Sequence, residues 1–315
     1  MTLSEHPQDD SPFHRGEQAV QTRVGVRDKM QSFGERVIRD FMPEQHREFF
    51  GQLPLIVIGA VDATGSPWAS MLMGAPSFIS SPDSHLLHID AHLLAGDPLA
   101  DSLNEGADVG LLGIEFHTRR RNRVNGPIVG KDAHGFTLQV RQSFGNCPKY
   151  INKRSCEIIG PQNITPQAPR ISDRLDASSA GQIRSADTFF IATHCSETPS
   201  QRSHGADVSH RGGKPGFVRI DDEHTLTWPD YSGNFLFNTL GNLMLNPRAG
   251  LLFPDFESGD MLYLSGRGEV IWDGDEVEAF PAAQRLVRFH IDRLVQLPAA
   301  LPMRWRFEEY SPFLE

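Results

Sequence analysis

The chain has 315 residues, 39% of them hydrophobic and 22% charged, which are ordinary globular values and leave room for two domains. Its 30 Lys and Arg against 40 Asp and Glu give a net charge of −10, which argues against a nucleic-acid partner. No apolar run reaches the roughly 18–20 residues that span a bilayer, and the polar N-terminus lacks a signal-peptide core. Three cysteines without C-x-x-C spacing favour a reducing compartment and no metal site. We therefore expect a cytoplasmic protein with no membrane partner.

Apolar residues at three- and four-residue spacings over about 16–50 predict a helical N-terminal segment, 1–50. A first β unit is expected over 51–157, with a short helix at PLADSLNEG (98–106) that closes at a glycine. Its strands are predicted at LIVIGAV (55–61), PWASMLMG (67–74), HLLHIDA (85–91), VGLLGIEF (109–116), RRNRVNGPIVG (120–130) and HGFTLQVRQSF (134–144).

Residues 158–170 contain three prolines and no periodicity, which predicts a linker. A second β unit is expected over 171–315, with helices at about 173–185 and at FNTLGNLML (237–245). Around six short strands and one or two helices per unit favour a small closed or split antiparallel barrel. A parallel α/β fold is disfavoured, because long helices do not alternate with the strands.

The two units repeat each other in sequence. VGLLGIEF (109–116) falls on AGLLFPDF (249–256) at an offset of 140, and LPLIVIGA (53–60) matches ADTFFIAT (186–193). ASMLMGAPSFI (69–79) matches DVSHRGGKPGFV (207–218) with one inserted residue. A duplication predicts two similar folds facing each other as an internal pseudo-dimer, and the differences between the copies indicate where a ligand sits.

The first difference is polar chemistry in the second copy, where Ser209, His210 and Arg211 replace the apolar residues 71–73. Arginine suits bidentate recognition of phosphate, and serine adds a neutral donor. The alternative interpretation is an exposed polar strand end followed by a glycine turn.

The second difference is a predicted helix start at Asn238 and Thr239, where the first copy has Pro98 and Leu99. Free backbone N–H groups at a helix start favour an anion. Asn and Thr are also ordinary N-cap residues, which is the competing explanation. Together, the two differences favour a phosphate site in the second unit.

The third feature lies in the first copy, where strand alternation would place Arg119, Arg121 and Arg123 on one face. These arginines could reach a ligand bound mainly by the second unit, or they could protect a solvated edge strand.

After the next strand, QSFGNCPKYINKR forms a polar turn in which Cys147 lies close to Lys149. A reactive thiol and a small buried cysteine are both open interpretations of Cys147.

The strings GADVSHRGGKPGFV, DYSGNFLFNTLGNLMLNPRAGLLF, RRRNRVNG and QSFGNCPKYI resemble those of the pyridoxamine 5′-phosphate oxidase-related, FMN-binding split-barrel proteins, in a duplicated subfamily. The resemblance covers roughly residues 45–295. It implies a mainly β (α+β) fold of tandem split β-barrels with flanking helices, in which the first repeat has a degenerate site and the second binds FMN. The cofactor-binding residues implied by position are Ser209, His210, Arg211, Asn238, Thr239, Asn242, Arg121 and Lys149. Neutral Asn238 and Thr239 stand where the family places basic phosphate ligands.

The leading hypothesis is an FMN-dependent oxidoreductase that transfers a hydride through flavin N5 to or from a small-molecule substrate. NADH or NADPH is a candidate electron donor, a homodimer of the whole chain stays open, and no catalytic acid or base can be assigned. The alternative is a non-enzymatic flavin- or haem-binding module, because fold alone does not fix function. Oxidation of pyridoxamine phosphate itself is less favoured, since no second basic cluster is evident for the substrate phosphate.

Overall fold

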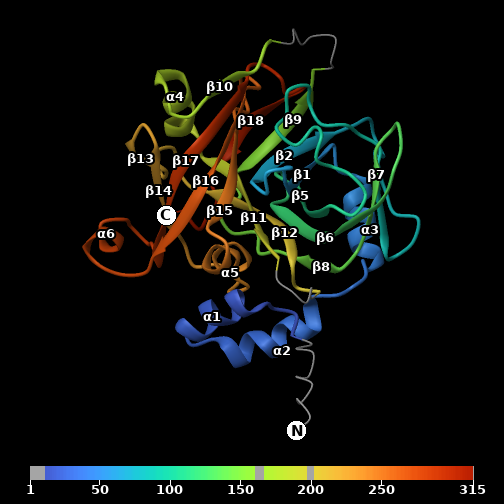
Figure 1. Ribbon diagram of the computed structural model, residues 1–315, viewed down its shortest axis with the longest axis horizontal. Coiled ribbons are helices and arrows are strands. Elements are labelled where there is room, and N and C mark those ends of the chain that lie inside the picture. The colour runs from blue at the N-terminus through green and yellow to red at the C-terminus, as the bar shows by residue number, and fades with distance from the viewer. Residues whose placement is uncertain (1–10, 160–166, 197–201, 315) are drawn as a thin grey trace.

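The computed structural model describes residues 11–159, 167–196 and 202–314 (Figure 1). The start of the predicted N-terminal segment (1–10) and most of the predicted linker (160–166) lie outside the described residues. The described part is mainly β, with two eight-stranded antiparallel sheets and one two-stranded sheet. The helices are α1 (Arg15–Arg23), α2 (Arg27–Val37), α3 (Glu44–Gly51), α4 (Ala177–Ser185), α5 (Asn238–Leu245) and α6 (Asp275–Glu278).

The first large sheet holds the first unit, and its strands run in the order β2-β1-β5-β6-β7-β4-β3, with β8 paired to β6. Its strands are β1 (Leu55–Val61), β2 (Pro67–Met73), β3 (Ile79–Ser80), β4 (Leu86–Ile89), β5 (Asp108–Glu115), β6 (Arg120–Lys131), β7 (Phe136–Gln139) and β8 (Gln142–Gly145).

The second large sheet has the corresponding order, β12-β11-β15-β16-β17-β14-β13, with β10 paired to β17. Its strands are β10 (Arg170–Ser172), β11 (Thr188–Cys195), β12 (Gly205–Gly212), β13 (Arg219–Asp222), β14 (Thr225–Asp230), β15 (Arg248–Pro254), β16 (Met261–Ile271) and β17 (Arg285–Leu297). Because both sheets follow the same order, the predicted tandem split-barrel architecture is confirmed.

The small sheet pairs β9 (Lys153–Ile158) with β18 (Met303–Glu309), so the end of the first unit contacts the end of the chain. The unit boundaries at 51–157 and 171–315 stay a prediction. In the first unit, the single strand predicted at 134–144 is two strands, β7 and β8.

The helix predicted at 98–106 is wrong, since the segment forms a series of turns. Ser102 N donates to Leu99 O and Ala100 N to Asp97 O, so each bond closes a four-residue β-turn. The Asp97 carboxylate accepts bonds from Leu99 N at 2.8 Å and from the Ser70 hydroxyl. The backbone bonds between residues of this segment span two or three residues rather than the four of an α-helix, so the chain turns here without forming one.

The alignment of β2 with β12 is also corrected, by one residue. Gly59 pairs with Ala69 and Gly110, while Ala192 pairs with Val208 and Gly250, so Ala69 corresponds to Val208. No residue is inserted in the following turn, where Ser77 and Gly216 both have positive φ (70° and 86°). The counterparts of Ser209, His210 and Arg211 are therefore residues 70–72. A shift of one residue exchanges the two faces of a strand, which makes this register decisive.

The two halves meet through glycines at equivalent positions. A Cβ on Gly110 would lie 2.7 Å from both Ala206 O and Asp207 Cα. On Gly250 it would lie 2.5 Å from Trp68 Cα and closer still to Pro67 O. Glycine at both positions allows β5 and β15 each to touch the backbone of the other half.

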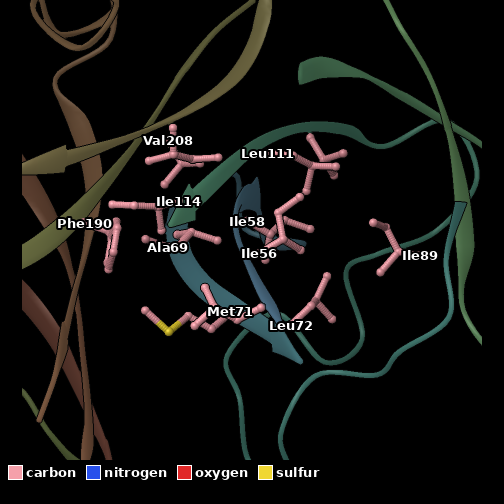
Figure 2. Packing of buried hydrophobic residues seen from close by; sticks show 14 of the residues in the cluster. Ile56, Ile58, Ala69, Met71, Leu72, Ile89, Leu111, Ile114, Phe190 and Val208 are labelled. Atoms are coloured by element: carbon pink, nitrogen blue, oxygen red, sulfur yellow. The ribbon is translucent and has the colours of Figure 1, made fainter. Parts of the chain in front are cut away.

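Apolar side chains extend this contact. Figure 2 shows Phe190 and Val208 of the second half beside Ala69, Met71 and Ile114 of the first. All five are buried and belong to one hydrophobic cluster, so the core is continuous across the two halves.

We expect Gly250→Ala to lower the free energy of unfolding by about 1–3 kcal/mol, because the new methyl group would meet backbone that cannot rotate away. Urea denaturation measures the change. Gly181→Ala in α4 is the control, since a Cβ there meets nothing within 4 Å and the helix should gain up to about 1 kcal/mol. Equal stability of Gly250→Ala and the parent chain would contradict the close contact.

Candidate functional site

A pocket opens between the two halves and is lined by residues of both. It contains about 890 Å³ of empty space, part of it open to solvent. The first half contributes β6 and the loop after β8, and the second contributes β12, the end of β14 and the start of α5. The predicted residues that line it are Arg121, Lys149, Ser209, His210, Arg211, Asn238 and Thr239.

The β12 residues are not an exposed strand end, because Ser209 and His210 are buried. Arg211 is partly exposed, and its Nη2 lies 3.8 Å from Asp230 Oδ1. The Arg211 Nε has no hydrogen-bond partner among the described residues. Arg211 therefore keeps donor capacity for a ligand.

Arg123 crosses from the first half into the second. Its Nη1 lies 3.0 Å from Asp207 Oδ1, and its Nη2 donates to Ser209 Oγ at 2.7 Å and to Val208 O at 2.8 Å. At Arg123, β6 pairs with β5 on one side and β8 on the other, and Arg123 is 3% exposed, so the edge-strand alternative is wrong. Arg119 precedes the strand and bonds Ile151 O instead of joining this face.

Arg121 holds the loop that follows β8. Its Nε donates to Cys147 O at 2.7 Å, its Nη2 to Lys149 O at 3.5 Å and its Nη1 to His210 Nδ1 at 3.1 Å. Each nitrogen of this guanidinium is thus bonded to protein. Arg121 therefore holds the pocket wall in place. Arg211 and Lys149 are the lining cations with fewer bonds to protein.

The start of α5 offers donors to the pocket. The N-cap residue Phe237 has left-handed backbone (φ 63°) and makes no side-chain cap bond to the first turn. The Thr239 hydroxyl is buried and has no hydrogen-bond partner among the described residues. Uncapped N–H groups and a free hydroxyl at a helix start suit an anion.

The Asn238 side chain is committed elsewhere. Its Oδ1 accepts from Arg123 Nη1 at 2.7 Å, and its Nδ2 donates to Glu17 Oε1 at 2.6 Å. Asn242 lies apart from the pocket, where its Nδ2 donates to Thr193 Oγ1 at 2.9 Å. The helix start at Asn238 is confirmed, but of its polar lining side chains Asn238 is already bonded to protein, and Thr239 keeps a hydroxyl without a partner among the described residues.

A loop of the first half closes one side of the pocket. Tyr150 donates to Ser232 O at 2.9 Å, and Lys149 Nζ donates to the same oxygen at 3.5 Å. The Tyr150 and Tyr231 rings pack against each other with centroids 5.1 Å apart and an interplanar angle of 34°. Cys147 also lines the pocket and is half-buried, so the fully buried interpretation is wrong.

Several aromatic lining residues escaped the sequence analysis. Tyr150, Phe235 and Phe237 all have positive φ, between 62° and 66°. Bulky residues seldom adopt this conformation, and such strain is concentrated at functional sites. Composition carries no signal for backbone strain, although Tyr231, Phe235 and Phe237 stand within DYSGNFLF and Tyr150 within QSFGNCPKYI, two strings that carried the resemblance.

The equivalent place, between β2 of the first half and β16 of the second, is filled. In the corrected alignment of β2 with β12, Met71 is the counterpart of His210. At the offset of 140 residues, Tyr263 is the counterpart of Arg123. Both side chains are completely buried in the shared core. The two copies therefore differ as the sequence predicts: polar residues line a pocket at one contact, and apolar packing fills the equivalent contact.

A buried chain of polar groups links α1 to the pocket. The Glu17 carboxylate accepts from His14 N at 3.0 Å and from Asn238, which in turn contacts Arg123. Gly16 and Gly241 bring α1 and α5 into close contact, and α1 lies directly beside α5 in Figure 1. Burial raises the pKa of Glu17 to about 8.

No protein-family model and no curated protein matches the chain. Among solved structures, it is similar to HupZ of Group A Streptococcus, with a TM-score of 0.31 and 16% identity over 38% of this chain and 91% of that chain. It is also similar to a putative pyridoxamine 5′-phosphate oxidase from Lactobacillus delbrueckii, with a TM-score of 0.30 and 15% identity over 39% of this chain and 94% of that chain. A third similar structure is an FAD-binding protein from Mycobacterium smegmatis, with a TM-score of 0.28 and 15% identity over 40% of this chain and 99% of that chain.

Each of these chains is similar to about two fifths of this one. The assignment of the fold rests on the matching strand order of the two halves. Within the described ranges, no helix is both long and apolar enough to cross a membrane. The same ranges contain no group of three His, Cys, Asp or Glu side chains arranged to hold a metal ion.

We predict that Glu17 makes stability fall as the pH rises. The folded chain keeps a proton on Glu17 up to about pH 8, whereas the unfolded chain releases it near 4.5, so the free energy of unfolding decreases between these values. Glu17→Gln should flatten the decrease, as measured by urea denaturation at several pH values. The exposed Glu35→Gln is the control and should keep the slope of the parent chain.

Asp207→Ala should destabilise the chain by about 3–5 kcal/mol, because it leaves Arg123 buried without its carboxylate. The matched control is Asp292→Ala, which breaks an exposed ion pair of the same length with Arg267 and should cost less than about 1 kcal/mol. Similar losses in the two variants would show that Arg123 does not depend on Asp207.

Proposed function

We propose that the chain binds FMN in the pocket between its halves and acts as an oxidoreductase on a small molecule. The observation that carries the proposal is the pair of donors at one end of the pocket, the buried free hydroxyl of Thr239 and the uncapped start of α5. Both face a pocket whose neighbouring side chains include Arg211 and Lys149. A dianionic terminal phosphate fits this set of donors.

The remaining lining suits a planar ring system. Tyr150, Tyr231, Phe235 and Phe237 supply aromatic surface, and His210 lies on the strand beneath. A flavin supplies redox chemistry of its own, while the protein binds, orients and shields it. Arg121 and Arg123 fix the walls through bonds to protein, so the bound group meets a prearranged site.

The resemblance of the sequence to FMN-binding split-barrel proteins supports this proposal. Two of the similar structures are a putative pyridoxamine 5′-phosphate oxidase and an FAD-binding protein. FMN is proposed over FAD because the donors gather at one helix start, as a single terminal phosphate requires. A soluble dinucleotide such as NADH or NADPH is the proposed electron donor.

Titration of the purified chain with FMN, followed by flavin fluorescence, tests the cofactor. Thr239→Val keeps the side-chain volume but removes the hydroxyl, and we expect the Kd for FMN to rise about fivefold to tenfold. Thr188→Val is the matched control, because the Thr188 hydroxyl is also buried and unpaired in the described structure but lines a different cavity. Its Kd should equal that of the parent chain.

The absorbance of the protein distinguishes the competing functions. Bleaching of a bound flavin spectrum by NADH or NADPH, with turnover, supports an enzyme, and a stable flavin spectrum supports a binding module. A Soret band after incubation with haem, without binding of FMN, would replace the proposed cofactor.

A further inference from the structure

We propose that Arg121 locks the neutral His210 ring in one tautomer, so that its Nε2–H is a hydrogen-bond donor to the ligand of the pocket. The inference rests on the proposed function for the identity of that ligand, FMN. The tautomer itself is a property of the chain alone. Arg121 is accordingly a positioning residue, and His210 is the group that touches the cofactor.

The hydrogen bond between the two side chains fixes the tautomer. Arg121 Nη1 lies 3.1 Å from His210 Nδ1, across the interface of the two halves. A guanidinium can only donate, so Nδ1 must be the acceptor and cannot carry the ring proton. The proton of a neutral imidazole therefore sits on Nε2.

The surroundings keep the ring neutral. Arg121 approaches from β6, Arg211 follows on β12 itself, and Arg154 lies on β9, while the Phe190 ring on β11 packs edge-on with its centroid at 5.7 Å. Burial, together with these arginines, holds the pKa of His210 well below its ordinary value. Burial lowers the pKa of Arg121 to about 9, so its guanidinium still carries its proton at neutral pH.

The donor that results has no acceptor in the described chain. His210 is 4% exposed, and its Nε2 is buried without a hydrogen-bond partner among the described residues. A buried N–H left unpaired costs about 1–3 kcal/mol, so such groups normally meet a partner. Because His210 lines the pocket, a carbonyl oxygen or ring nitrogen of the bound flavin is the acceptor that fits.

Two-bond ¹H–¹⁵N correlation spectra of the histidine rings test the tautomer without any cofactor. The signal that disappears in His210→Gln belongs to His210, and we expect it to show a protonated Nε2 and an unprotonated Nδ1 at neutral pH. Arg121→Met removes the donor, and the ring nitrogens should then shift toward the average of both tautomers. A protonated Nδ1 in the parent chain, or an unchanged tautomer in Arg121→Met, would overturn the inference.

Two variants of His210 test the donor. Glutamine places an amide N–H near the position of Nε2, whereas asparagine places one near Nδ1. We expect the Kd for FMN to rise about fivefold to tenfold in His210→Asn and to stay within about twofold of the parent value in His210→Gln. Equal affinities of the two variants would overturn the role of Nε2.

The outcomes separate this inference from the proposed function. A parent chain that binds no FMN refutes the proposed cofactor, and the spectra of the histidine rings still decide whether Arg121 sets the tautomer. A parent chain that binds FMN while both His210 variants bind equally well leaves the flavoprotein standing and removes the donor.

Discussion

The close approach of the two halves at Gly110 and Gly250 is the constraint on which the rest of the structure depends. Each glycine lets its strand touch the backbone of the opposite half, at residues 206–207 and 67–68. A side chain of any size would separate the sheets. With the sheets in contact, β6 of the first half reaches over β12 of the second, and the two units share one apolar core.

This contact explains why the candidate site belongs to neither half alone. Arg123 pairs with Asp207 and Arg121 with His210, in both cases across the interface. At the equivalent contact of the other pair of strands, Tyr263 of the second half is buried in the core that it shares with the first half. Of the two equivalent contacts, the one between β6 and β12 is polar and lines the pocket, while the one between β16 and β2 is filled by buried side chains.

Most of the positive charge at the pocket stabilises its walls. Arg121 bonds two loop carbonyls and His210, and Arg123 bonds Ser209, Val208 O and Asn238. Such bonds offset the cost of burying a guanidinium group, although the buried Nε of Arg123 has no partner among the described residues. The polar chain continues to Glu17 on α1, which accepts a hydrogen bond from Asn238, so the N-terminal helix helps to hold Asn238 in place. Donors without partners in the described chain, such as those of Thr239 and Arg211, are the ones available to a ligand.

The sequence by itself determined the duplication, the mainly β fold and most strands, because apolar alternation and turn residues are local signals. It also marked Ser209, His210, Arg211 and Thr239 through their contrast with the first copy. Tertiary structure alone decided the register of β2 against β12, since a one-residue shift changes the face without changing the composition. It also decided which polar groups remain free. Glu17 and Asn238 are 221 residues apart in sequence and meet through the packing of α1 on α5, which no local pattern encodes.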